Sequence, residues 1–81
     1  MHIQLKTTAI DWSRCPIVET NPRKVSGVPI LKGTRVQADS IVENYAGGSP
    51  VREISENFGI PEATIRELLT FAARQQEHLK S

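Results

Sequence analysis

Three stretches in the second half of the chain place hydrophobic residues three or four positions apart, so that each set shares one face of a helix. The first stretch is "ADSIVENYA", the second is "VREISENF" and the third begins "PEATIRELLTFAA". The apolar positions are Ala38, Ile41, Val42 and Tyr45, then Val51, Ile54 and Phe58, then Ile65, Leu68, Leu69 and Ala72. This pattern predicts three helices within residues 37–80.

Glycine, serine and proline mark the expected helix boundaries. The glycines at positions 47–48 end the first stretch and Gly59 ends the second, both as C-cap signals. Ser49 is a favoured N-cap residue, and Pro50 suits the first position of the second helix. Pro61 opens the third helix in the same way.

The first 36 residues follow a different pattern. Residues 1–16 show no clear period, and we expect Trp12 to be a packing anchor rather than a ligand-stacking residue. From Ile17 onward, short runs of β-branched residues alternate with turn signals, which predicts short strands joined by turns at Gly27 and Gly33.

The expected architecture is therefore mainly α, with a small N-terminal β-hairpin or pair of strands and a three-helix, helix-turn-helix domain. We expect the 81 residues to form a single domain. Residues 1–36 would form an N-terminal arm with short strands, and residues 37–80 the three-helix region.

The second and third helices have the spacing of a helix-turn-helix unit. Ser55 is a small residue where the two helices would cross, and Gly59 lies in the short turn. Apolar residues at the expected positions would hold the pair together. A plain helical hairpin in a three-helix bundle can show the same spacing.

If this unit binds DNA, the start of the third helix should face the major groove. Arg66 is the only strong guanine reader there, while glutamate can accept a hydrogen bond from cytosine. Because DNA affinity depends mainly on neutralising phosphates, cations from the N-terminal half would have to contribute. The predicted DNA-binding residues are Lys32, Arg35, Arg52, Glu62, Ala63 and Arg66.

Charge is divided unevenly along the chain. Residues 1–36 contain six basic and two acidic residues, a net charge of +4, whereas residues 37–81 contain four basic and seven acidic residues, a net charge of −3. The difference is typical of a basic arm on a less basic body. An unevenly charged but merely solvated surface is the alternative interpretation.

Small size predicts support from a second subunit, and we expect a homodimer. Cys15 is the only cysteine, so an intrachain disulfide is impossible. His2 and His78 lie near opposite ends and form no ligand cluster with it, so we expect neither a metal nor another cofactor. With no signal-peptide core and no membrane-length apolar run, the chain is expected in the cytoplasm.

The residues do not indicate an enzyme, and no catalytic residues are predicted. Cys15 lacks a histidine partner in the sequence, so a buried, idle thiol is the preferred interpretation over a nucleophile activated by Arg14. The segment "SGVPILKGTRV" also fails as a phosphate-binding loop, because its glycines are six positions apart and its second glycine is followed by Thr34 and Arg35.

The segments "DWSRCPIVE", "KVSGVPILKGTRVQADSIVENYAGGSPVREISENFGI" and "IRELLTFAA" resemble the bacterial domain-of-unknown-function family 433. The family signature, G-x-P-x-[IL]-x-G-T-R, falls on residues 27–35, with Ile30 or Leu31 as the aliphatic residue. The resemblance implies a homeodomain-like three-helix fold.

Many members of that family resemble VapB-type antitoxins encoded beside a PIN-like ribonuclease toxin. The resemblance therefore implies a regulator that neutralises such a toxin by direct binding and represses the shared operon. Phe71 lies off the main apolar stripe and is a candidate partner contact, with core or dimer packing as its alternative role. The competing hypothesis is a protein-interaction module with the helix-turn-helix shape but no DNA binding.

Overall fold

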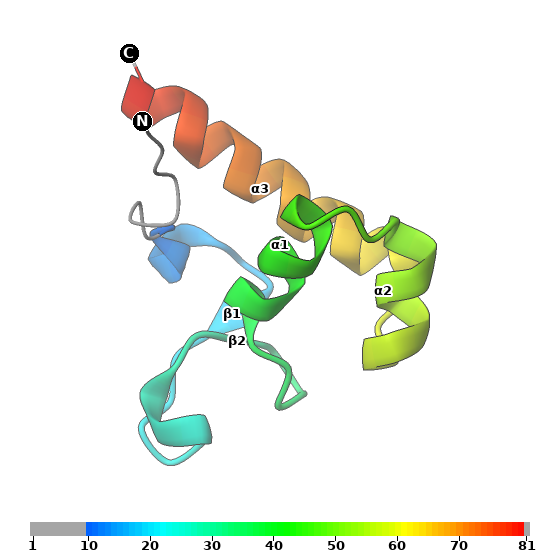
Figure 1. The fold of residues 1–81 in the computed structure, drawn as a ribbon. Helices are drawn as coiled ribbons and strands as arrows, with labels where there is room; N and C mark the ends of the chain where they lie inside the picture. Colours follow the sequence, from blue (N-terminus) through cyan, green and yellow to red (C-terminus); the bar gives the residue numbers. More distant parts are fainter. Residues whose placement is uncertain (1–9, 81) are drawn as a thin grey trace.

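The computed structural model describes the backbone of residues 10–80 and the side chains of residues 10–24 and 26–75. Three helices dominate it, and a two-stranded antiparallel sheet precedes them (Figure 1). The elements are η2 (Trp12–Arg14), β1 (Val18–Glu19), η3 (Val25–Gly27), β2 (Ile30–Leu31), α1 (Ala38–Ala46), α2 (Val51–Phe58) and α3 (Glu62–Lys80). The predicted fold class, mainly helical with small N-terminal strands, is confirmed. Residues 1–9 of the predicted basic arm, with His2, and the side chain of His78 lie outside the described residues.

The two strands pair at Val18 with Leu31 and at Glu19 with Ile30. The N–H of Lys32 extends the pairing by donating to the carbonyl of Ile17 at 2.9 Å. A long connection containing η3 joins the strands. Gly27, the last residue of η3, has a φ of 79°. The strand pair is therefore not a tight hairpin.

The tight turn of the predicted hairpin lies after β2. Gly33 adopts a φ of 77°, and an isolated bridge pairs Ile30 with Gln37. The N–H of Leu31 donates to the carbonyl of Val36 at 3.0 Å, and the Thr34 hydroxyl donates to the carbonyl of Leu31 at 2.8 Å. Residues 31–36 thus form a closed turn that leads directly into α1.

The core forms where the inner face of α3 meets α1, α2 and the sheet. All three helices contact one another. The predicted stripe of α3 is confirmed, because Ile65, Leu68 and Ala72 are buried and Leu69 packs against them. In Figure 1, α3 runs along one side of the molecule with α2 at its N-terminal end.

The predicted apolar face of α1 is only partly correct. Ala38 and Ile41 are fully buried, and Val42 is half-buried. Tyr45, however, is 50% exposed. It lies in the last turn of α1, just before the chain leaves toward α2, and its phenol oxygen favours contact with water.

The predicted N-cap of α2 is wrong by one position. The helix begins at Val51, and Pro50 is its N-cap, with no side-chain capping bond. The reason is that Ser49 is bound to the end of α1, since its N–H donates to the carbonyl of Asn44 at 3.0 Å. Proline suits the cap position because a missing N–H costs nothing where no intrahelical partner exists.

Trp12 is a packing anchor, as predicted. Its side chain is 3% exposed, and its ring lies 5.7 Å from the ring of Phe71, at an interplanar angle of 21°. Its Nε1–H donates to a carboxylate oxygen of Asp39 at 2.9 Å. The short helix η2 is therefore fixed to both α1 and α3, and the neighbouring Cys15 is buried beneath it.

Candidate functional site

The turn between α2 and α3 is held by three hydrogen bonds around Ser55. Gly59 ends α2 in the left-handed conformation, with a φ of 69°, and its N–H donates to the carbonyl of Ser55 at 2.9 Å. The N–H of Ile60 donates to the same carbonyl at 3.2 Å, and the Ser55 hydroxyl donates back to the carbonyl of Ile60 at 2.6 Å. The small residue predicted at the helix crossing therefore also fixes the turn.

The start of α3 presents the residues predicted to read DNA. The carbonyl of Pro61 accepts the N–H groups of Thr64 and Ile65, which begins the helix. Ala63 and Arg66 are exposed, while Glu62 is partly covered. Arg66 is engaged, because its guanidinium nitrogen lies 3.0 Å from a carboxylate oxygen of Glu62.

The arginine of α2 is engaged in the same way. Arg52 pairs with Glu56 one turn later, at 3.8 Å, and both side chains are largely exposed. Such exposed pairs stabilise a helix by less than about 1 kcal/mol. Both arginines can therefore exchange an intrahelical carboxylate for a ligand at low cost, but both start from a partly neutralised state.

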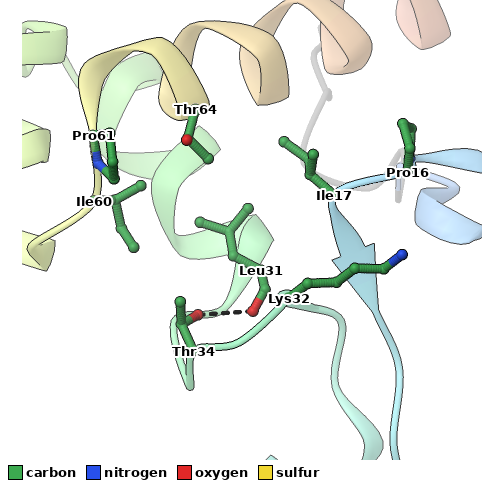
Figure 2. Close-up of a pocket in the computed structure, with 8 residues that line it drawn as sticks. All are labelled: Pro16, Ile17, Leu31, Lys32, Thr34, Ile60, Pro61 and Thr64. Atoms are coloured by element: carbon green, nitrogen blue, oxygen red, sulfur yellow. Dashed lines mark hydrogen bonds between the residues drawn. The ribbon is translucent and has the colours of Figure 1, made fainter.

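Lys32 and Arg35 lie on the turn between β2 and α1, and both are exposed. Within the described part of the chain, no carboxylate lies within ion-pair distance of either residue, whereas Lys24 pairs with Glu19 at 3.5 Å. Lys32 shares a groove with Pro61 and Thr64. The fold thus places Lys32 and the start of α3 on one groove, although the two are far apart in sequence, and the Lys32 side chain extends past Ile17, away from Thr64 (Figure 2).

Phe71 is half-buried and stacks on Trp12. This contact accounts for its position off the main apolar stripe and agrees with the packing role considered for it. Its contact with a partner stays a prediction. Asp39, which binds the indole of Trp12, was not predicted. The only sequence signal at Asp39 is an acid in the first turn of a helix, where the macrodipole already favours it.

The carboxyl group of Asp11 has a shifted pKa. Asp11 caps η2, and the Ser13 hydroxyl donates to its Oδ1 at 2.6 Å. This bond, together with the Ser13 N–H and the charge of Arg14, holds the pKa of Asp11 below its ordinary value. Asp11 is fully exposed, so the shift reflects local capping of a short helix rather than a catalytic environment.

The described residues show neither an accessible thiol nor a metal-binding cluster. Cys15 is 4% exposed, so its thiol is shielded from reagents. No group of three or more histidine, cysteine, aspartate or glutamate side chains that could hold a metal occurs in the part of the chain described. Of the helices described, none is long and apolar enough to cross a membrane.

Comparison with protein families matches residues 18–72 to the family described as "Protein of unknown function (DUF433)". The match covers more than half of the chain and includes the turn around Gly33, both α1 and α2, and the buried stripe of α3. Neither the curated proteins nor the solved structures gave a match. By this match, the chain belongs to the DUF433 family.

Proposed function

We propose that the protein is an antitoxin-like regulator that binds a PIN-like ribonuclease toxin directly and represses its own operon through the helix-turn-helix. It acts in the cytoplasm as a homodimer. The observation that carries the proposal is the α2–turn–α3 unit, whose turn is closed by Ser55 and Ile60 and which shares a groove with the exposed Lys32. The homeodomain-like character of the three helices is part of the same proposal.

The DNA-binding part of the proposal assigns a role to each predicted residue. Lys32 and Arg35 neutralise phosphates beside the groove that α3 enters. Arg66 reads guanine, Glu62 accepts from cytosine, and Ala63 contacts the thymine methyl group. Arg52 contacts the backbone from α2. Because each subunit supplies few free cations, two subunits must combine their half-sites.

Gel-shift experiments with the DNA upstream of the gene test this part. The wild-type protein should retard the duplex at low salt, and Arg66→Ala and Lys32→Ala should both weaken the shift. Arg74→Ala is the matched control, because it removes the same charge from an exposed position two turns further along α3. Loss of one phosphate contact should also lower the salt dependence of binding by about one unit of slope.

Co-expression with the product of the neighbouring gene tests the toxin-binding part. The two proteins should copurify, and the regulator should restore growth to cells that express the toxin. Absence of both a complex and growth rescue would overturn the toxin-binding part.

A second candidate function is a protein-interaction module that does not bind DNA. The ion pairs of Arg52 and Arg66 favour it, because both arginines of the helix-turn-helix already have carboxylate partners. Glu53 and Glu67 add further negative charge to the same helices. An intact toxin complex with no gel shift at micromolar protein would decide for this candidate.

A further inference from the structure

A groove of about 280 Å³ lies between the strand pair and the start of α3 (Figure 2). Ile17 contributes from the segment before β1, Leu31 from β2, and Ile60 from the turn before α3. This volume lies just below the range for small-molecule sites, roughly 300–1,000 Å³. It suits a single anchoring side chain of a larger partner.

The walls of the groove are mainly apolar. Leu31 and Ile60 are buried and form its floor, Ile17 is half-buried, and the exposed Pro61 closes one end. In Figure 2, Ile17, Leu31 and Ile60 extend into the same space from three segments of the chain. Such a preformed apolar surface favours burial of another apolar side chain, because burial removes both from water.

The polar residues that line the groove are Lys32, Thr34 and Thr64. The hydroxyl of Thr34 is already used, since it donates to the carbonyl of Leu31. The side chain of Lys32 runs along the edge past Ile17 in Figure 2. No carboxylate of the described residues pairs with this ammonium group. A ligand that fills the groove can therefore gain a charge interaction at Lys32 without breaking an existing ion pair.

We infer that this groove is a docking site for a protein segment that places one aliphatic or aromatic side chain on Leu31 and Ile60 and a nearby carboxylate against Lys32. The inference rests on the proposed function for its first partner, the toxin, and adds to it the location and chemistry of the contact. A buried apolar anchor at the centre with polar and charged groups around its rim is the usual arrangement of protein interfaces.

Charge and apolarity favour this occupant over the others. A DNA backbone, to which the proposed function also assigns Lys32, would satisfy the ammonium group but leave the apolar walls without a partner. The chain's own residues 1–9 contain Lys6 and no acidic residue, so they cannot supply the carboxylate. A second copy of the chain is the remaining alternative occupant. Self-association of the protein, measured below, tests this alternative.

Calorimetric titration of the neighbouring gene's product tests the inference with three full-length variants. Lys32→Glu reverses the rim charge, and Thr64→Arg places a long charged side chain at the groove, which Thr64 lines. Each should weaken binding by at least about tenfold. Arg23→Glu is the matched control, because it makes the same charge change at an exposed position outside the groove. It should change the affinity by no more than about twofold.

A second experiment needs no knowledge of the natural partner. Random peptides displayed on phage are selected on the wild-type protein and counter-selected on Lys32→Glu. The enriched peptides should join an aliphatic or aromatic residue to a nearby aspartate or glutamate. In the full chain, they should shift the amide NMR signals of Leu31, Ile60 and Thr64. Circular dichroism of each variant verifies its fold, and Lys32→Glu keeps the test valid if Thr64→Arg does not fold.

The two experiments separate the inference from the proposed function. A tight toxin complex that neither variant weakens overturns the inference and leaves the function standing. Selected peptides that bind at the groove without any toxin complex overturn the function and support the inference. Peptide-induced shifts confined to other residues, or self-association that Thr64→Arg abolishes, overturn the inference. If Lys32→Glu changes only the gel shift and not toxin binding, the Lys32 edge of the groove binds DNA, and the inference is overturned as well.

Discussion

The indole of Trp12 donates a hydrogen bond of 2.9 Å to the carboxylate of Asp39, 27 positions later in the chain. The bond joins the short helix η2 to the first turn of α1. Because the indole is buried, its N–H needs a partner within the protein. Asp39 thereby allows a large aromatic side chain to complete a small core.

Replacing Asp39 with alanine should lower the free energy of unfolding by about 1–3 kcal/mol, because the buried indole N–H loses its acceptor. Urea denaturation followed by circular dichroism measures this loss. In a Trp12→Phe background the same replacement should cost much less, since no N–H remains to be satisfied. Equal losses in the two backgrounds would contradict a specific Trp12–Asp39 interaction.

Gly59 is the residue whose backbone conformation allows α2 to end where it does. Its φ of 69° is unfavourable for residues with a Cβ, so Gly59→Ala should lower the free energy of unfolding by about 1–2 kcal/mol. Apart from Gly59 itself and its two chain neighbours, no heavy atom of the described residues lies within 4 Å of the position that the alanine methyl group would take, so the cost is that of the backbone alone. Gly59→Asn should cost less, because asparagine tolerates the left-handed region. The urea midpoints of the two variants provide the comparison.

The ion pair between Glu62 and Arg66 should restrain DNA binding. Glu62→Gln frees the guanidinium and removes a negative charge from the start of α3. The glutamine oxygen can still accept from cytosine, so affinity for the upstream duplex should rise roughly fivefold at low salt. Glu67→Gln removes the same charge one turn later, at a carboxylate that forms no ion pair among the described residues. It should raise affinity less. An equal gain in both variants would show that only the overall charge matters.

Asp11 should titrate below its ordinary range. Its native pKa is lowered mainly by the Ser13 hydroxyl, so its cap stabilises the protein above the pKa of the unfolded chain. That contribution is lost as the pH falls through the lower, native pKa. Carboxyl NMR titration should show Ser13→Ala raising the pKa of Asp11 toward its ordinary value. Arg14→Ala should change it less, because the charge of Arg14 is the weakest of the causes.

The helices were predictable because their signals are local. The buried stripe of α3 and the end of α2 at Gly59 depend on spacing and backbone preference within a few residues. The start of α2 was misplaced because Ser49, a good cap in isolation, is held by a backbone bond to Asn44 at the end of α1. A preference read from one residue could not include that competing bond.

The contacts around the candidate site were not predictable, because they join distant segments. Nothing near Trp12 in the sequence points to Asp39 or Phe71, and nothing near Lys32 points to Thr64. Trp12 meets Asp39 and Phe71 because η2 packs against the helices, and Lys32 and Thr64 line one groove because the turn after β2 lies near the start of α3. The ion pair of Glu62 with Arg66 is different, since their spacing of four residues places both on one helix face.

The stack of Trp12 on Phe71 also has a consequence for synthesis of the chain. The two rings are 59 positions apart, so the tryptophan emerges from the ribosome long before its aromatic partner is made. Synthesis proceeds at roughly 5–20 residues per second, so the nascent chain exposes Trp12 and the apolar residues of β1 and β2 for several seconds. Completion of the core is thus a late event that waits for most of α3, and during that interval the unfinished chain is open to proteases and chaperones.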